Sequence, residues 1–133
     1  METVSTLVVT CPYCLKPAVL EDSAVVYRWR SYGMIWRCAP CDAYVGTHKG
    51  SVDHKPLGRL ANRELREWKK AAHRAFDPVW KTGRGVEKMM SRRVAYARFA
   101  QVLGMRELHI GWCDVEQCKR LIEAVEKERS DGV

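Results

Sequence analysis

Four cysteines in two matched pairs are the residues whose types and spacing most clearly predict chemistry. Cys11 and Cys14 form one C-x2-C pair, Cys38 and Cys41 form the other, and 23 residues separate the pairs. A two-residue gap lets a tight turn aim both sulfur atoms at one point. Two such turns together supply the four thiolates of a tetrahedral zinc site. The spacing therefore predicts one structural Zn2+ bound by all four cysteines.

Two other uses of these cysteines compete with zinc. Disulfides are rare in a reducing cytosol, and we expect a cytoplasmic protein because the opening run 7–9 is too short for a secretory signal. No stretch of about 18 apolar residues predicts a membrane span. A redox-active C-x-x-C usually occurs singly, after a strand of a longer α/β chain. The paired spacing favours zinc over both alternatives.

Positive charge is concentrated in the middle of the chain. The formal net charge is +7, but residues 57–106 carry thirteen Lys and Arg against four Asp and Glu. Residues 1–56 are nearly neutral, and residues 107–133 carry an excess of acids. A basic segment of this kind attracts polyanions such as nucleic acid. Its ordinary alternative is that these cations only solvate the outer faces of helices.

Within the basic segment, five cations recur at helical spacing and form the predicted phosphate-contacting row. They are Arg59, Arg63, Arg66, Lys70 and Arg74. Phosphate contacts give affinity without sequence readout. A second candidate anion site is His48 with Lys49, which stand between Gly46 and Gly50. The alternative there is that the two glycines merely permit a bend.

His109, Cys113 and Cys118 form a weaker candidate set. A histidine near a cysteine can activate a nucleophile or bind a second metal. However, Cys118 falls on an apolar helical stripe, where cysteine behaves as a small hydrophobe. His109 lies between two apolar residues, a pattern more typical of a structural histidine. We therefore favour packing roles for these residues.

The first third of the chain has strand-like patterns around the cysteine pairs. We expect strands over residues 6–10, 24–30 and 34–37, and a further short strand over 43–47. A turn at Gly33, where positive φ is permitted, joins the middle two into a hairpin. This pattern predicts a zinc ribbon, a small sheet whose core depends on the metal.

Helical patterns follow from residue 57 onward. Apolar residues recur at three- and four-residue spacing from Leu57 to Phe76, with Asn62 as a candidate N-cap and Asp77-Pro78 as the expected end. A second helix is predicted over 86–103, and Gly104 ends it.

A third helix begins after Asp114, and Gln117 completes a capping box. The fold class is therefore α+β, a four-cysteine zinc ribbon packed against about three α-helices. We expect residues 1–56 to form the ribbon module and residues 57–133 the helical part packed on it, as one compact unit.

Six segments carry a further signal, namely CPYC at 11–14, CAPCDAYVGTHKG at 38–50, LGRLANRELR at 57–66, AHRAFDPVWK at 72–81, AYARFAQVLG at 95–104 and HIG at 109–111. Together they resemble a bacterial and phage zinc-finger-containing family of unknown function, domain of unknown function 3268. The resemblance extends from Cys11 to about Cys118 and implies that the four paired cysteines are zinc ligands and that the source is bacterial or phage. Leu15 stands where a glycine is usual after the first pair.

These observations lead to three functional hypotheses. The first is a non-enzymatic zinc protein that binds nucleic acid through phosphate contacts from the basic helix. The second is a phage or mobile-element interaction module that uses the same cations against an acidic host protein surface. The third is a metal-dependent nuclease built around His48 and His109, which requires a second metal and convergent acids. We favour the first.

Overall fold

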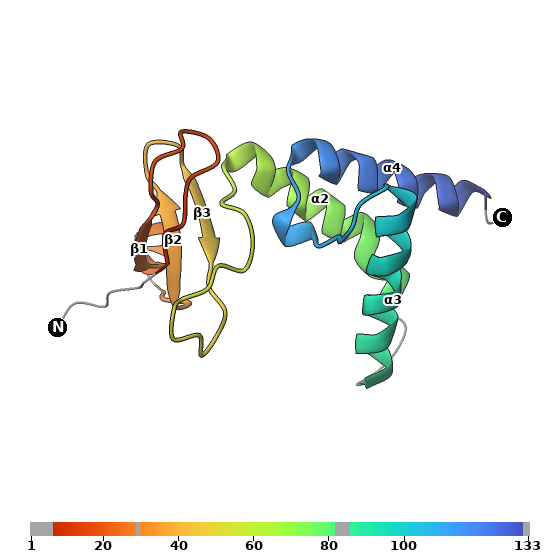
Figure 1. Cartoon of the computed structure of the whole chain (residues 1–133), viewed down its shortest axis with the longest axis horizontal. Coiled ribbons are helices and arrows are strands. Elements are labelled where there is room, and N and C mark those ends of the chain that lie inside the picture. The colour runs from red at the N-terminus through yellow and green to blue at the C-terminus, as the bar shows by residue number, and fades with distance from the viewer. Residues whose placement is uncertain (1–6, 29, 82–85, 132–133) are drawn as a thin grey trace. The chain divides into compact units, whose positions relative to one another are not determined.

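The computed structural model describes residues 7–28, 30–81 and 86–131 (Figure 1). The chain divides into two compact units, Met1–Arg63 and Glu64–Val133. The first unit contains a three-stranded antiparallel sheet, and the second is built from helices. The predicted α+β class is confirmed. None of the helices in the described part of the chain is long and apolar enough to cross a membrane.

The sheet of the first unit has the strand order β1-β2-β3. Strand β1 covers Val19–Asp22, β2 covers Met34–Cys38 and β3 covers Ala43–Gly46. Both pairings are antiparallel, so that Trp36 of the central strand lies opposite Leu20 on one side and Val45 on the other. Strand β2 and the short partner β3 confirm the strands predicted over 34–37 and 43–47.

The strand predicted over 24–30 is wrong, because its first residues form the short helix α1, Ala24–Tyr27. The side chain of Asp22 explains the difference. Its Oδ1 accepts a hydrogen bond from the Ala24 N–H at 2.8 Å, and its Oδ2 accepts one from the Ser31 hydroxyl at 3.0 Å. These local bonds turn the backbone away from an extended course. Trp29, which was part of the predicted strand, lies outside the described residues.

The strand predicted over 6–10 is also wrong for its described residues. Residues 7–9 have no regular structure, and Thr10 forms only an isolated bridge with Pro17. The outer strand of the hairpin is instead β1, which directly follows the first cysteine turn. Gly33 adopts a φ of +102° just before β2, as its predicted turn requires.

The segment 47–62 runs beside the sheet and completes the first unit. Backbone bridges join Tyr44 to Ala61 and Thr47 to Pro56. The indole N–H of Trp36 donates to the carbonyl of His54 at 2.7 Å. This buried tryptophan therefore ties the central strand to a loop 18 residues further along the chain.

The second unit contains the helices α2, Arg63–Trp80, α3, Val86–Val102, and α4, Val115–Asp131 (Figure 1). A single turn of 3-10 helix, Ile110–Trp112, precedes α4. The N–H of Gln117 donates to Asp114 Oδ1 at 2.8 Å, and Gln117 Oε1 accepts from the Asp114 N–H at 3.0 Å. These two bonds confirm the predicted capping box.

Helix α2 differs from its prediction at both ends. It begins at Arg63, directly after Asn62, so the earlier apolar residues Leu57 and Ala61 are outside it. It does not end at Asp77-Pro78 but continues to Trp80, with Pro78 inside the helix. Trp80 is buried, and its indole N–H donates to Asp77 Oδ1 at 3.2 Å. Burial of this large side chain outweighs the cost of proline in the last turn.

Aromatic residues form the centre of the second unit. Phe76 of α2 packs against Tyr96 and Phe99 of α3, with ring centroids 4.6 and 5.7 Å away. Helix α3 ends where predicted, because Gly104 adopts a φ of +68°. The following N–H, from Met105, donates to the carbonyl of Ala100 at 2.8 Å and closes the helix end.

Candidate metal centre

The four predicted ligands converge on one point in the first unit. Their sulfur atoms all lie within 4.8 Å of one another, and Cys14 Sγ is 3.7 Å from Cys38 Sγ. Zinc–thiolate bonds of about 2.3 Å give a tetrahedron whose sulfur atoms are about 3.8 Å apart. A disulfide requires about 2.05 Å, and all six cysteines are free thiols. The geometry therefore fits one structural Zn2+.

Two tight backbone turns place the ligands. After the first pair, the Leu15 N–H donates to the Cys11 carbonyl at 2.9 Å, and the Cys11 N–H donates to the Lys16 carbonyl at 2.9 Å. In the second turn the Asp42 N–H donates to the Ala39 carbonyl at 3.1 Å. The residue after each pair adopts the left-handed backbone conformation, with φ of +65° at Leu15 and +50° at Asp42. Aspartate tolerates this conformation, whereas leucine pays a steric cost there.

The sheet and the cysteine turns share one small core. Cys11 is fully buried, and Cys14 and Cys41 are partly buried against the cluster. The buried members of the cluster are Cys11, Ala18, Trp36, Cys38, Ala43 and Leu60. Five small or medium side chains and one indole make too little core for an independent domain, so the metal must supply much of its stability.

The thiols differ strongly in acidity. A hydrogen bond from the Lys16 backbone lowers the pKa of Cys14 to about 7. Burial, together with the neighbouring thiols, raises the pKa of Cys41 to about 12. Four thiolates this close repel one another, so the protein alone keeps some of them protonated. A divalent cation removes that conflict, because it binds the deprotonated form of every ligand.

Four protein ligands also determine what the ion can do. A catalytic zinc needs an open position for water or substrate, whereas a closed four-thiolate site has none. The centre is therefore structural. It joins the turn at Cys11 to the turn at Cys38 and thereby holds β1, β2 and β3 together.

Tyr13 is a residue of this centre that sequence reasoning missed. It lies between the ligands of the first pair, and its hydroxyl donates to the Leu60 carbonyl at 3.2 Å. The same oxygen accepts a hydrogen bond from the Asn62 N–H at 3.1 Å. Tyr13 thus connects the first metal turn to the end of the segment 47–62. An aromatic residue inside a C-x2-C turn was the available signal.

The predicted anion-binding residues fall into separate groups. Arg63, Arg66, Lys70 and Arg74 lie on α2, but Arg59 precedes the helix and is partly buried. The prediction of one helical row is therefore wrong for Arg59, because α2 begins four residues later. His48 and Lys49 are exposed in the loop after β3. They belong to the first unit, whereas most of α2 belongs to the second.

The set His109, Cys113 and Cys118 does not form a metal site. Among the described residues, the four paired cysteines are the only group of three or more potential ligands that converges. Cys113 and Cys118 are buried, and the Cys113 thiol donates to the His109 carbonyl at 3.4 Å. The His109 side chain is exposed and contacts the ring of Tyr96.

Comparison with known proteins agrees with this geometry. The family model of the zinc-finger-containing domain DUF3268 matches residues 7–128, a range that includes all four ligands, helices α1 to α3 and most of α4. No curated protein and no solved structure gives a significant match to the chain. The chain therefore belongs to the DUF3268 family of zinc-finger-containing domains.

Proposed function

We propose that this zinc protein binds nucleic acid without enzymatic chemistry, through phosphate contacts made by α2. The observation that carries the proposal is a row of cations along one face of this helix. It consists of Arg63, Arg66, Lys70 and Arg74, and we call it the α2 row. Phosphate contacts of this kind supply affinity without reading sequence.

The positions in the α2 row follow from helix geometry. At 100° per residue, spacings of three, four and four residues confine its four Cα positions to an arc of about 80°. The buried residues Leu65, Ala72 and Phe76 lie on the opposite side. Burial of that apolar face turns the row outward. Arg63, Lys70 and Arg74 are exposed, and Arg66 is partly so.

Glu67 neutralises Lys70 of this row only in part. Lys70 Nζ lies 3.3 Å from Glu67 Oε1, but both side chains are about two-thirds exposed, at 66% and 67%. An exposed pair of this kind is worth well under about 1 kcal/mol and is easily exchanged for a phosphate. The nearby carboxylate of Asp77 contacts His73 instead, at 3.2 Å.

Two further groups remain secondary candidates for the same role. Arg59 and the exposed pair His48 and Lys49 lie in the first unit. The N–H of His48 is used internally, since it donates to the Lys55 carbonyl at 2.8 Å. This bond supports a structural role for the turn at His48. The α2 row is therefore the primary proposed site.

A salt titration tests the proposal. Fluorescence anisotropy with a labelled 20-base-pair duplex and a single strand should give affinity that falls steeply with salt. Three or four neutralised phosphates predict a slope of log K against log salt of about −3 on the duplex. The triple variant Arg63→Glu, Lys70→Glu and Arg74→Glu should abolish binding at physiological salt.

A matched control separates this row from net charge. The variant Arg28→Glu, Arg30→Glu and Lys127→Glu makes the same charge change at exposed positions outside α2. It should retain most of the affinity. Equal loss in both variants would contradict a defined site. No binding to either nucleic acid at low salt would overturn the proposal and favour an acidic protein surface as the partner of these cations.

We infer a reducing compartment for this protein, namely the cytoplasm of a bacterium or of a phage-infected cell. Six free cysteines and a thiolate metal centre suit such a compartment, because oxidation would destroy the ligands. Cell fractionation followed by zinc analysis of the protein tests this location.

A further inference from the structure

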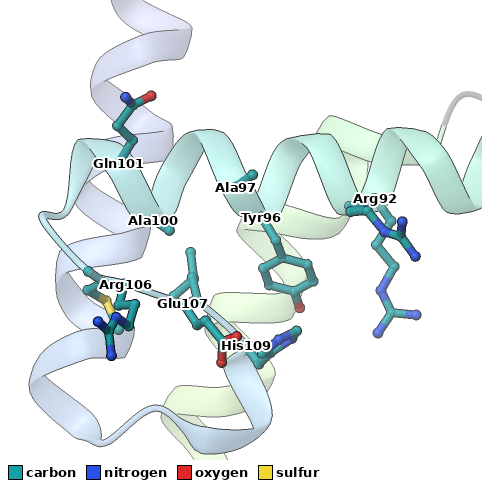
Figure 2. Close-up of a pocket in the computed structure, with 11 residues that line it drawn as sticks. Arg92, Tyr96, Ala97, Ala100, Gln101, Arg106, Glu107 and His109 are labelled. Carbon is teal, nitrogen blue, oxygen red and sulfur yellow. The ribbon is translucent and has the colours of Figure 1, made fainter.

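A pocket of about 670 Å3 opens on the second unit between α3 and the loop that follows it (Figure 2). Its volume lies within the roughly 300–1,000 Å3 typical of small-molecule sites. Arg92, Arg93 and Tyr96 line it from α3, and Arg106, Glu107 and His109 line it from the loop. None of these residues belongs to the zinc centre or to the α2 row, so the pocket requires its own explanation.

The pocket carries an excess of positive charge. Three arginines face one carboxylate, that of Glu107. Arg93 and Arg106 are exposed, and neither forms an ion pair with any carboxylate in the described part of the chain. The planar guanidinium fork matches two phosphate oxygens, so such a cluster selects a phosphate over a less charged group.

Aromatic rings hold the third arginine in place without neutralising it. The Arg92 guanidinium carbon lies 5.4 Å from the ring centroid of Trp80 and 5.9 Å from that of Tyr96. Cation–π contacts orient the side chain but leave its N–H donors available. A ligand phosphate that meets Arg92 would therefore find a pre-positioned donor.

The end of the pocket opposite Arg92 can accommodate a flat ring. The His109 ring is 5.4 Å from the ring of Tyr96 and is itself exposed, so one of its faces is available for stacking. Small side chains, Ala97 and Ala100, line the α3 wall and leave room beside these rings. In Figure 2, Tyr96 lies between Arg92 on one side and Glu107 and Arg106 on the other.

Glu107 narrows the class of ligand. A carboxylate repels a phosphate, so Glu107 must face another part of the ligand. Its two oxygens can accept hydrogen bonds from ring N–H and amino groups. Guanine presents two such donors side by side on its pairing edge, whereas adenine presents one donor beside an acceptor.

We propose that this pocket binds a nucleoside monophosphate, with the phosphate on Arg92 and Arg93 and the base at the other end, beside His109, Glu107 and Arg106. A guanine base is preferred. The ligand chemistry is the same for a free nucleotide and for the terminal nucleotide of a strand. The proposal stands apart from the proposed function, because the pocket and the α2 row share no residue.

Isothermal titration of the zinc-loaded, full-length protein tests the ligand class. GMP should bind in a saturable 1:1 manner and at least about tenfold more tightly than guanosine or inorganic phosphate alone, because each of these lacks half of the contacts. AMP should bind more weakly than GMP, and Glu107→Gln should narrow that difference. No GMP binding at millimolar concentration, or phosphate binding as tight as GMP, would overturn the proposal.

Variants then locate the site. Arg93→Gln and Arg106→Gln should each weaken GMP binding about tenfold, since each removes a charged hydrogen bond. Arg74→Gln, which makes the same change in the α2 row, should leave GMP binding unaltered. Circular dichroism melts confirm that the variants fold. Unchanged GMP affinity in a folded Arg93→Gln, Arg106→Gln double variant would refute this pocket as the site, whatever the outcome for polynucleotides.

Competition experiments distinguish the two sources of the ligand. A short oligonucleotide with a 5′-phosphorylated guanosine should displace GMP if the pocket accepts the end of a strand. The same oligonucleotide without the phosphate should not displace it. Failure of both to compete, with GMP still bound, assigns the pocket to the free nucleotide.

Discussion

The sulfur atoms of Cys14 and Cys38 lie 3.7 Å apart, although the two cysteines are 24 positions apart in the chain. That distance is close to the edge of a zinc–thiolate tetrahedron, about 3.8 Å, and far from a disulfide bond. Between the two cysteines, the chain contains β1, α1 and most of β2. One zinc ion bound by both cysteines therefore closes this loop, which the small core could not close alone.

Replacement of one ligand should remove the metal and unfold the first unit. In Cys38→Ser the weaker oxygen ligand replaces a thiolate, and we expect zinc content to fall from one ion per chain to nearly none. The NMR amide signals of β1 to β3 should lose their dispersion. Cys118→Ala is the matched control, because Cys118 is buried in the second unit and should leave the zinc content at one.

The left-handed residue after the first cysteine pair offers a stabilising change. Leu15 has a φ of +65°, and its side chain is 77% exposed, so it costs backbone strain and contributes little packing. Leu15→Gly should stabilise the zinc-bound first unit by about 1 kcal/mol, which denaturant titration can measure. Leu15→Ala retains a Cβ at the same φ and should give no gain. A destabilised glycine variant would contradict this account of the turn.

The capping box at the start of α4 provides a test in the second unit. Asp114→Ala removes the acceptor of the Gln117 N–H and should cost about 1 kcal/mol of unfolding free energy. Asp114→Asn retains a side-chain oxygen and should cost much less. Urea titration followed by helical circular dichroism measures both. Equal losses in the two variants would indicate that the charge, and not the cap, is what matters.

Acid should release the metal in a predictable direction. Zinc binds thiolates, and the protein alone holds the pKa of Cys14 near 7 and that of Cys41 near 12. Above pH 7, Cys14 is already deprotonated, so zinc displaces protons mainly from the other ligands. Below pH 7, Cys14 is protonated too, so zinc must displace one additional proton when it binds. Zinc affinity, measured by chelator competition from pH 8 to pH 5, should therefore fall more steeply below pH 7 than above it. A slope that does not change would contradict these acidities.

The metal ligands could be predicted from the sequence because C-x2-C spacing encodes local geometry. The same is true of Gly104 and of the Asp114–Gln117 capping box, whose signals lie within a few residues of the feature they form. Strands β2 and β3 could also be predicted, since they flank the second cysteine pair.

Other elements depend on contacts that short patterns do not contain. Residues 24–27 are rich in β-forming types, yet the Asp22 side chain turns them into α1. Pro78 favours a helix end, yet burial of Trp80 extends α2 beyond it. The pocket beside Tyr96 could not be predicted, because its arginines come from α3 and from a loop whose path the sequence pattern does not give.

The central claim is that one zinc ion on four thiolates holds the first unit together, and X-ray absorption at the zinc edge tests it most directly. For the purified protein we predict four sulfur neighbours at about 2.3 Å for each zinc, and one zinc per chain. Nitrogen or oxygen neighbours in the first shell, or a folded protein with no bound metal, would contradict the claim.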